Sequence, residues 1–254
     1  MSQPNTGLAR ALSKLGYCSR SRAAELIRLG RVNVDGTVHR DPETPVSRRS
    51  QIAVDDSPVE RSQSIYLMLN KPRGILTTAS DERGRETVYS ILRAPPATGD
   101  PQKTSLPWVA PVGRLDKASE GLLLLTNDSA WAARITDPET HLNKTYHVQI
   151  NRLASEDFLK SLVHGVKSKG ELLRTKTVRL LRSGQKNCWL EIILDEGKNR
   201  HIRRMMESNG VEVLRLIRTA IGELQLGNLE KGMFRCLTKE EKRMLDRAML
   251  DGEK

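Results

Sequence analysis

Aromatic residues are scarce in this 254-residue chain, of which Phe, Trp and Tyr together make up only 4%. A core therefore has to rest on aliphatic side chains, and a hydrophobic content of 37% is enough to exclude wholesale disorder. No apolar run approaches the roughly 18–20 residues of a membrane-spanning helix, which excludes a chain that crosses the membrane. The first residues also lack the apolar stretch of a secretory signal, so we expect a cytoplasmic protein.

Cysteine is rare as well. The chain has three cysteines, Cys18, Cys188 and Cys236, which lie far apart and form no C-x-x-C pair. This pattern excludes a disulfide framework and a thiolate zinc site, and we expect reduced, buried thiols. The five histidines also lack the paired spacing of metal ligands: His39, His141, His147, His164 and His201. The sequence therefore predicts no metal site.

Acidic charge is in deficit, because 31 Asp and Glu residues stand against 42 Lys and Arg residues. The net charge is +11 and the sequence pI is about 9.8. Such an excess predicts a polyanionic partner, with RNA or DNA favoured over an anionic membrane surface. The length allows one large domain or a small domain beside a medium one, at roughly 100–200 residues per domain.

The first segment, 8–54, shows two short helical patterns followed by a hairpin. The first helix ends at Gly16, and the second is capped by Ser19 or Ser21 and ends at Gly30. Alternating valines then flank Asp35-Gly36, a strong signal for a tight hairpin turn. Within 8–31 a single acid, Glu25, stands against six basic residues, which are Arg10, Lys14, Arg20, Arg22, Arg28 and Arg31. This imbalance favours a surface that binds phosphates over the alternative of an ordinary solvated helix face.

A polar stretch with a proline, 55–63, is predicted to be a linker between a first domain at 1–60 and a second at 61–254. Beyond residue 64, strand patterns outnumber helical ones too strongly for a regular βαβ repeat, so an α+β fold is expected. The Pro-rich segment 94–107 is predicted to be an exposed loop inserted in the second domain.

The first candidate for chemistry is the loop 113–121, which two glycines bracket between two apolar strands. Asp116 lies there between Arg114 and Lys117, which favour an ionised carboxylate able to act as a base or a nucleophile. The alternative is an aspartate that bonds only the backbone of its own turn.

The second candidate is a turn and basic helix, with the helix predicted over 199–208. Four cations, Lys198, Arg200, Arg203 and Arg204, lie at or near its start, where they predict an anion site and could pair with Asp116. The alternative is a surface helix with its apolar residues in the core. A third candidate, Tyr146, lies on the strand pattern KTYHVQI and either packs in the sheet or stacks on a base.

These motifs carry a family resemblance that covers roughly residues 8–245. The N-terminal segment resembles an S4 RNA-binding domain through SRSRAAELIRLGRVNVDG. The catalytic motif of the RsuA/RluB/RluE/RluF branch of pseudouridine synthases is similar to GRLDKASEGLLLLTND. Further similarity to this branch lies in YLMLNKPRG and in the segment 195–238. The resemblance implies a small S4-like α/β domain followed by a mixed, largely antiparallel-sheet synthase domain.

The resemblance also implies roles for individual residues. Asp116 matches the catalytic carboxylate, and Tyr146 matches the tyrosine that packs against the target base. Lys198 falls where the family has a basic residue that pairs with the aspartate, and Arg200 and Arg203 compete for that role. We expect Arg114, Arg200, Arg203 and Arg204 to contact RNA. Two departures are Ser129, where glycine is frequent in the family, and the length of the Pro-rich loop.

The implied reaction converts a flipped-out uridine of ribosomal RNA to pseudouridine without a cofactor or metal. Asp116 attacks C1′, adds to the base or abstracts the C2′ proton, and the sequence leaves these routes open. The expected partner is ribosomal RNA or a pre-ribosomal particle, with a monomeric enzyme, and the motif pattern favours 23S over 16S RNA. The alternatives are a non-catalytic S4-type RNA-binding or ribosome-assembly protein, a DNA-binding regulator, and a nucleosidase that releases the base to water.

Overall fold

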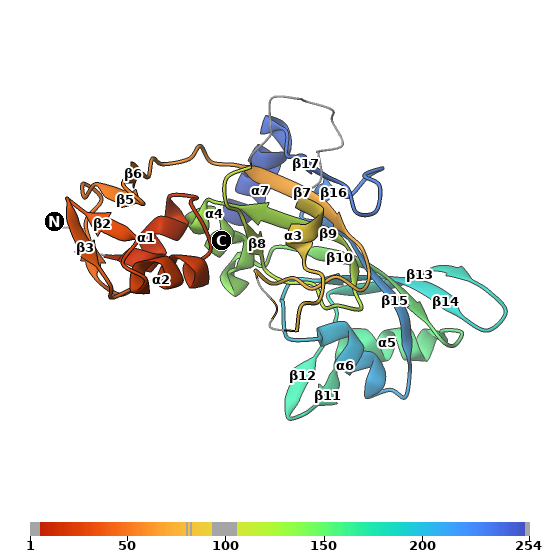
Figure 1. Ribbon diagram of the computed structural model, residues 1–254. Helices are drawn as coiled ribbons and strands as arrows, with labels where there is room; N and C mark the ends of the chain where they lie inside the picture. The colour runs from red at the N-terminus through yellow and green to blue at the C-terminus, as the bar shows by residue number, and fades with distance from the viewer. Residues whose placement is uncertain (1–5, 80, 82, 93–105, 252–254) are drawn as a thin grey trace. The chain divides into compact units, whose positions relative to one another are not determined.

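The contacts of the computed structural model, which describes residues 6–79, 81, 83–92 and 106–251, divide the chain into two compact units. The first unit comprises 1–66, 100–110 and 125–129, and the second comprises 67–99, 111–124 and 130–254. Figure 1 shows the helices and strands of each unit. Most of the loop predicted at 94–107 lies outside the described residues.

The two predicted N-terminal helices are present in the first unit as α1 (Leu8–Lys14) and α2 (Arg20–Arg28). Gly16 follows α1 with a φ of +81°, the left-handed conformation that a glycine adopts without strain where a helix stops. Of the two possible caps for α2, Ser19 is the one used, because its side chain accepts a hydrogen bond of 3.1 Å from the Arg22 amide.

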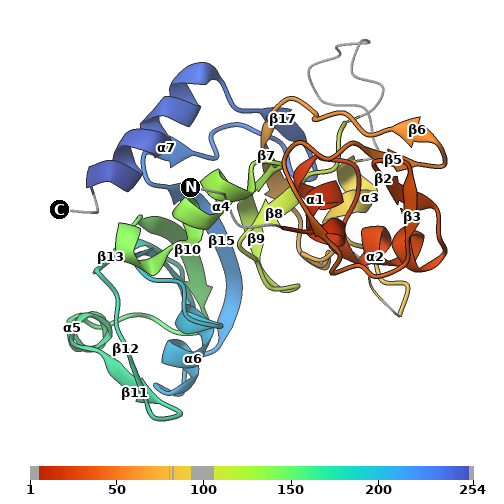
Figure 2. The same cartoon turned by 90° about the vertical axis from the view of Figure 1, so that its left-hand side faces the viewer.

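A small antiparallel sheet accompanies these helices in the first unit (Figure 2). Its order is β3-β2-β5-β6, with β2 (Val32–Val34), β3 (Thr37–His39), β5 (Ile52–Val54) and β6 (Ser57–Pro58), and β1 (Thr6–Gly7) pairs separately with β4 (Pro45–Val46). Asp35 and Gly36 have φ values of +51° and +82°, so the predicted hairpin turn is confirmed. The helices bury Leu8, Leu12 and Ile27 in one cluster with the strand valines.

The prediction that 55–63 is a linker is wrong for its first residues. Asp55 and Asp56 adopt left-handed conformations, with φ of +48° and +60°, and β6 pairs with β5 immediately after them. Aspartate tolerates this conformation better than most residues, and Pro58 is accommodated because β6 is an edge strand. These residues therefore form a hairpin of the first unit, and the domain boundary near residue 60 stays a prediction.

A nine-stranded sheet forms the largest element of the fold, and this mixed, mostly antiparallel architecture confirms the α+β prediction. The main order is β13-β14-β10-β15-β9-β7-β17, with β16 beside β15 and β8 beside β9. Strands β9 and β15 run parallel, whereas β10 is antiparallel to both β14 and β15. The bounds are β7 (Tyr66–Lys71), β8 (Ala110–Val112), β9 (Glu120–Thr126), β10 (Lys144–Ile150), β13 (Thr177–Ser183), β14 (Cys188–Leu194), β15 (Val213–Ile221), β16 (Leu224–Gln225) and β17 (Phe234–Cys236).

The remaining elements are short helices and one two-stranded ribbon. They are α3 (Val88–Leu92), α4 (Ser129–Thr136), η1 (Pro138–Thr140), α5 (Glu156–His164), the ribbon of β11 (Val166–Ser168) and β12 (Glu171–Leu173), α6 (His201–Glu207) and α7 (Lys239–Asp251). A capping box precedes α7, since Thr238 and Glu241 exchange hydrogen bonds of 2.8 and 3.1 Å between backbone amide and side chain. None of the helices among the described residues is long and apolar enough to span a membrane.

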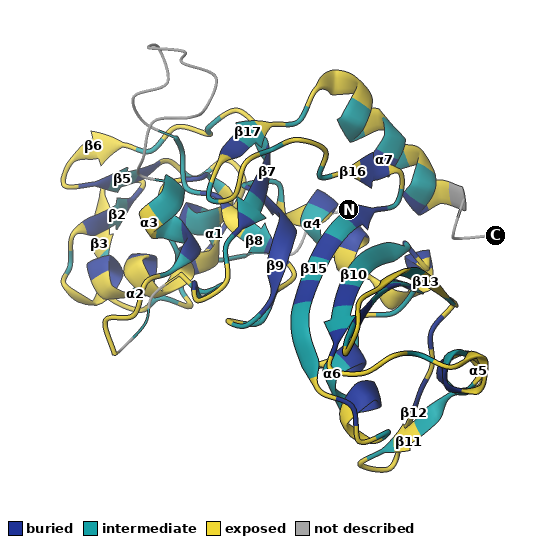
Figure 3. Cartoon of the chain, turned by 90° about the vertical axis from the view of Figure 1, so that its right-hand side faces the viewer, coloured by how far each residue is buried: buried dark blue, intermediate teal, exposed yellow. Residues whose placement is uncertain are grey.

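Burial in the nine-stranded sheet fits the apolar pattern of its strands. All seven residues of β9 are buried, as expected for a continuous apolar run at the centre of a sheet (Figure 3). Helices α5 and α6 pack on β10 and β14 in a cluster that includes Val148, Leu190 and Met205. On the same face of β10, Tyr146 borders this cluster.

Two sequence predictions differ from the structure in detail. Helix α6 begins at His201 instead of 199, because Arg200 adopts a left-handed conformation with φ of +48°. Cys188 is buried as expected, whereas Cys18 is half-buried and Cys236 is exposed at the end of the edge strand β17. The prediction of three buried thiols is therefore wrong for Cys236, which lies at the last residue of an edge strand, where no further strand covers the outer edge.

Candidate active site

A pocket of about 600 Å³ lies within the second unit and brings the predicted catalytic residues together. Its walls come from the loop 113–119, from β10 and β15, and from the turn that leads into α6. Asp116, Tyr146 and Lys198 all line it, together with Arg114 and Arg200. Residues from three distant parts of the sequence therefore share one cavity.

Backbone contacts hold the loop that carries Asp116 in the pocket wall. The Asp116 carbonyl accepts a hydrogen bond of 2.9 Å from the Ser119 amide, while its carboxylate accepts none among the described residues. The alternative of an aspartate that only bonds its own turn is therefore wrong for the carboxylate. At the end of the loop, a Cβ on Gly121 would lie 2.2 Å from the Arg218 carbonyl oxygen, so only glycine fits there.

The cation nearest the Asp116 carboxylate is Arg200, whose Nη1 lies 4.0 Å from Oδ2. The expected partner, Lys198, instead places its Nζ 2.9 Å from Glu196 and 3.1 Å from the Leu172 carbonyl oxygen. Glu196 is only two residues away on the same turn, so Lys198 pairs with this neighbouring carboxylate and not with Asp116 across the pocket. The structure thus favours Arg200, which the sequence offered as a competitor, over Lys198.

Two of the basic residues at the start of α6 are engaged inside the protein. Arg203 donates to the Ala118 carbonyl oxygen at 2.9 Å, which ties α6 to the Asp116 loop. Arg204 donates to the Ser168 carbonyl oxygen at 2.8 Å and pairs with Glu171 at 2.6 Å. Burial lowers the pKa of Arg203, but a guanidinium stays charged at any ordinary pH. Arg203 therefore contacts the Asp116 loop, and Arg204 contacts the ribbon of β11 and β12, so neither guanidinium is directed into solvent.

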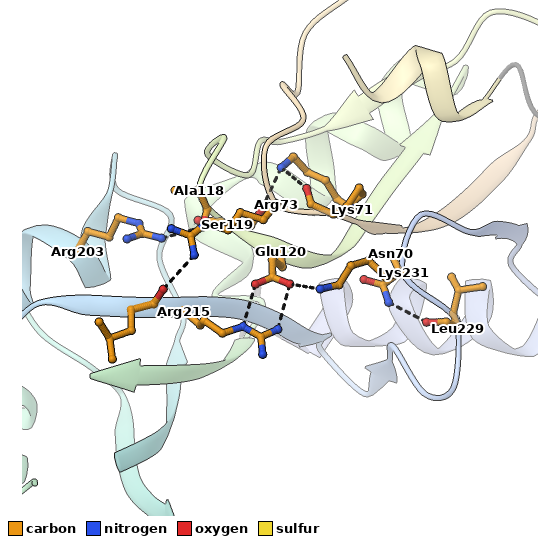
Figure 4. A network of polar contacts seen from close by, with 12 residues as sticks. Asn70, Lys71, Arg73, Ala118, Ser119, Glu120, Arg203, Arg215, Leu229 and Lys231 are labelled. Carbon is orange, nitrogen blue, oxygen red and sulfur yellow. Dashed lines mark hydrogen bonds and ion pairs between the residues drawn. The ribbon is translucent and has the colours of Figure 1, made fainter. Parts of the chain in front are cut away.

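A buried lysine that sequence reasoning missed supports the same loop through its backbone (Figure 4). Lys71 is fully buried, and its Nζ donates to the carbonyl oxygens of Pro72, Asp116 and Ser119 at 3.0–3.2 Å. Burial lowers the pKa of Lys71 to about 8, against the opposing effect of the Asp116 and Glu120 charges. A single lysine at the end of the apolar strand YLMLNK was the available signal for such a role.

A second missed feature is the buried carboxylate of Glu120, at the start of β9. It accepts two hydrogen bonds of 3.1 Å from Arg215 and pairs with Lys231 at 2.6 Å (Figure 4). Burial acts to raise the pKa of Glu120, but the hydrogen bonds from Arg215 and Lys231 outweigh it and lower the pKa. The network anchors the strand that follows the Asp116 loop, and no spacing in the sequence relates its three members.

Another cavity, of about 520 Å³, adjoins the other side of the Asp116 loop in the same unit. Asp116, Arg114 and Asn199 line both cavities, and the second adds Arg83 and Lys117. Asp81 pairs with Arg85 there at 2.6 Å. Positive side chains therefore surround Asp116 on both sides.

The six basic residues predicted on the N-terminal helices are all exposed in the first unit: Arg10, Lys14, Arg20, Arg22, Arg28 and Arg31. Arg22 pairs with Glu25 at 2.7 Å, and Arg31 pairs with Asp55. The other four have no acidic partner in the part of the chain that the structure describes. These four residues, Arg10, Lys14, Arg20 and Arg28, form the basic helical surface of the first unit.

Comparisons with known proteins agree with both units. Residues 65–208 match the RNA pseudouridylate synthase family, and residues 6–52 match the S4 domain. The chain is 39% identical over 92% of its length to an uncharacterized RNA pseudouridine synthase of Rickettsia bellii (strain RML369-C), and covers 97% of that protein. It is 33% identical to the ribosomal large subunit pseudouridine synthase B of Bacillus subtilis (strain 168), over 96% of each chain.

A solved structure supports the same assignment. A crystal structure of a pseudouridylate synthase superposes with a TM-score of 0.62 at 29% identity and covers 94% of this chain and 99% of its own. The predicted family and the predicted S4 domain are thereby confirmed, and the alternative of a non-catalytic protein is not supported. The chain belongs to the RNA pseudouridine synthase family, whose members are isomerases, and it carries an N-terminal S4 domain.

Proposed function

We propose that this enzyme converts a specific uridine of ribosomal RNA, in the 23S molecule of the large subunit, to pseudouridine, with Asp116 as the catalytic carboxylate. The observation that carries the proposal is the meeting of Asp116, Tyr146 and Arg200 in one cation-lined pocket. The choice of the large subunit rests on the similarity to the Bacillus subtilis protein along nearly the whole chain.

The reaction exchanges one glycosidic bond for another. The N1–C1′ bond breaks, the base turns, C5 bonds to C1′, and N1 gains a proton in place of the one that C5 loses. No atom and no electron is lost overall, so the reaction needs no external oxidant or reductant. The proposed carboxylate acts at the glycosidic bond as a base or a nucleophile. Asp116 suits this task because its side chain is 36% exposed and lines the pocket, and the Arg200 guanidinium lies 4.0 Å from its carboxylate.

Tyr146 supplies an aromatic surface for the base. Its ring is half-buried against the core cluster and lines the pocket near Asp116. A cavity of about 600 Å³ has room for a nucleoside that has left its stack. Extruding the target costs a few kcal/mol, least where the RNA is already unpaired, and contacts to the flanking phosphates offset this cost.

Phosphate contacts come from the exposed cations. In the first unit we assign this role to the basic helical surface, whose members lack acidic partners among the described residues. At the pocket, Arg114 and Arg200 are exposed and take the same role. Arg203 and Arg204 are positioning residues in this proposal, because their guanidinium groups bind backbone carbonyls.

The decisive experiment compares Asp116→Asn with the wild-type enzyme on ribosomal RNA transcripts, read by site-resolved pseudouridine mapping. The variant keeps the shape but removes the charge, so we expect a loss of at least about 10³-fold in turnover with RNA affinity unchanged within about threefold. Asp157→Asn, an exposed aspartate on α5, is the matched control and should retain full activity. Appreciable turnover by Asp116→Asn would refute the catalytic role.

A further inference from the structure

Two cations that the proposed mechanism has not used lie beside Tyr146 in the pocket. Arg218 on β15 stands directly opposite Tyr146 on β10 in the antiparallel register. Lys144 lies two residues before Tyr146, so it projects from the same face of β10. Both Lys144 and Arg218 line the pocket.

Arg218 and Lys144 both carry N–H groups that have no hydrogen-bond acceptor among the described residues. Arg218 is only 6% exposed, and its Nε donates to the Leu122 carbonyl oxygen at 2.7 Å. Its Nη2 is buried and has no hydrogen-bond partner among the described residues. The half-buried Lys144 ammonium likewise has neither a hydrogen bond nor an ion pair in the described part of the chain. Buried donors without acceptors are costly, which points to a ligand that supplies acceptors.

The electrostatics point in the same direction. Burial and, to a smaller extent, the Arg218 charge lower the pKa of Lys144 to about 8, against the opposing effect of Asp195. Lys144 is therefore still mainly protonated at neutral pH, so two like charges are kept together in one partly buried place. An electron-rich group between them would relieve their repulsion and satisfy their free N–H groups.

Resting on the proposed function, we propose that Lys144 and Arg218 bind the carbonyl oxygens of the target uracil and stabilise the negative charge of the detached ring. When the N1–C1′ bond breaks, its electron pair leaves with the base, and the resulting charge is shared by N1, O2 and O4. Two cationic donors at the edge of the ring are placed to stabilise that charge as it develops.

The symmetry of uracil makes one pair of donors useful on both sides of the reaction. A half-turn of the ring about the line through N3 and C6 exchanges N1 with C5 and, at the same time, O2 with O4. A donor that holds one carbonyl oxygen before the turn therefore meets the other carbonyl oxygen after it. Lys144 and Arg218 retain the ring in both orientations, while Tyr146 supplies the surface on which it turns.

The location favours a base over a phosphate as the occupant. Lys144 and Arg218 flank an aromatic ring on the sheet face, where a planar ligand fits. The more exposed cations of the pocket, Arg114 and Arg200, are available to phosphates. The inner pair is thus left for the polar edge of the base.

The test combines a protein variant with RNA substrates that differ from one another by a single atom of the target base. Single-turnover rates are measured for wild type and Lys144→Met on target RNA that carries uridine, 2-thiouridine or 4-thiouridine at the modified position. A sulfur accepts hydrogen bonds poorly, so we expect the wild-type rate to fall about tenfold with at least one thio-substituted RNA. Lys144→Met should be about 10–100-fold slower on uridine and should lose most of this sulfur effect.

Several variants keep the result interpretable. Lys176→Met removes an exposed lysine outside the pocket and should behave as wild type, whereas Lys144→Arg restores the charge and should recover much of the rate. Lys144→Gln is measured beside Lys144→Met, with thermal melting of both, so that a folding defect in one variant does not decide the outcome.

Two results would overturn the inference. One is a Lys144→Met enzyme as fast as wild type on uridine, and the other is a sulfur effect of equal size in both enzymes. A wild-type enzyme that forms no pseudouridine in ribosomal RNA would overturn the proposed function together with this inference. Activity of the wild type on ribosomal RNA therefore separates failure of the inference alone from failure of both.

Discussion

The cations of the two units differ in what surrounds them. On α1 and α2 of the first unit the basic side chains are exposed, and four of the six have no acidic partner among the described residues. Around Asp116 in the second unit, Lys71, Arg203 and Arg218 are buried or half-buried and donate to backbone carbonyl oxygens. The same residue types are thus left open to solvent in one unit, and in the other they bind the backbone of the Asp116 loop and of β9.

This difference predicts different effects on affinity and turnover. An exposed cation acts on a phosphate through water and salt, so its removal lowers RNA affinity and weakens the salt dependence. A buried cation fixes geometry, so its removal lowers the rate of the bound complex. The following three predictions test this comparison in order of expected size.

The largest effect is expected from Lys71→Met, which removes the ammonium that binds the Asp116 and Ser119 carbonyl oxygens. A small displacement of the loop would lower kcat about 100-fold, while RNA affinity stays within about threefold of wild type. Single-turnover kinetics and filter binding measure the two quantities. The control is Lys167→Met, an exposed position on β11, and equal losses of affinity and rate in Lys71→Met would break the comparison.

A smaller effect is expected from pH. Lys144 has a pKa of about 8 under the combined influence of burial, Arg218 and Asp195, so its charge is present below that pH and lost above it. The single-turnover rate should therefore fall as the pH rises, by about tenfold near one unit above the pKa. Lys144→Arg keeps its charge there and should extend the active range upward. An identical decline in both enzymes would assign the titration to another group, such as Lys71.

The smallest effect is expected on the basic helical surface. Arg20→Gln with Arg28→Gln should weaken RNA binding several-fold and reduce the salt slope by about 0.7–0.9 for each phosphate that is no longer neutralised, with kcat unchanged. Arg22→Gln is the matched control on α2, because this arginine already pairs with Glu25 and should contribute less. Binding isotherms at several salt concentrations measure both. A fall in kcat without a change in salt slope would contradict the assigned role.

Much of the local structure could be predicted because it depends on neighbours in the chain. Ser19 caps an amide three residues away, and Asp35-Gly36 turns the chain between adjacent strands, so the local sequence was sufficient to predict both. The buried run of β9 was equally readable from its leucines. The errors are also local. Asp55-Asp56 makes a turn where a linker was predicted, and α6 begins at His201, after the left-handed Arg200, instead of at residue 199.

The sequence by itself therefore determined the helix caps, the hairpin turn, the buried strand and the motif residues Asp116 and Tyr146. Only the tertiary structure decided which cation approaches Asp116, that Lys71 and Arg203 hold its loop, and that Lys144 and Arg218 lie beside Tyr146. The physical reason is that these contacts join strands and loops far apart in the sequence, where strand order and register set the neighbours. Spacing along the chain carries no information about such partners until the sheet has formed.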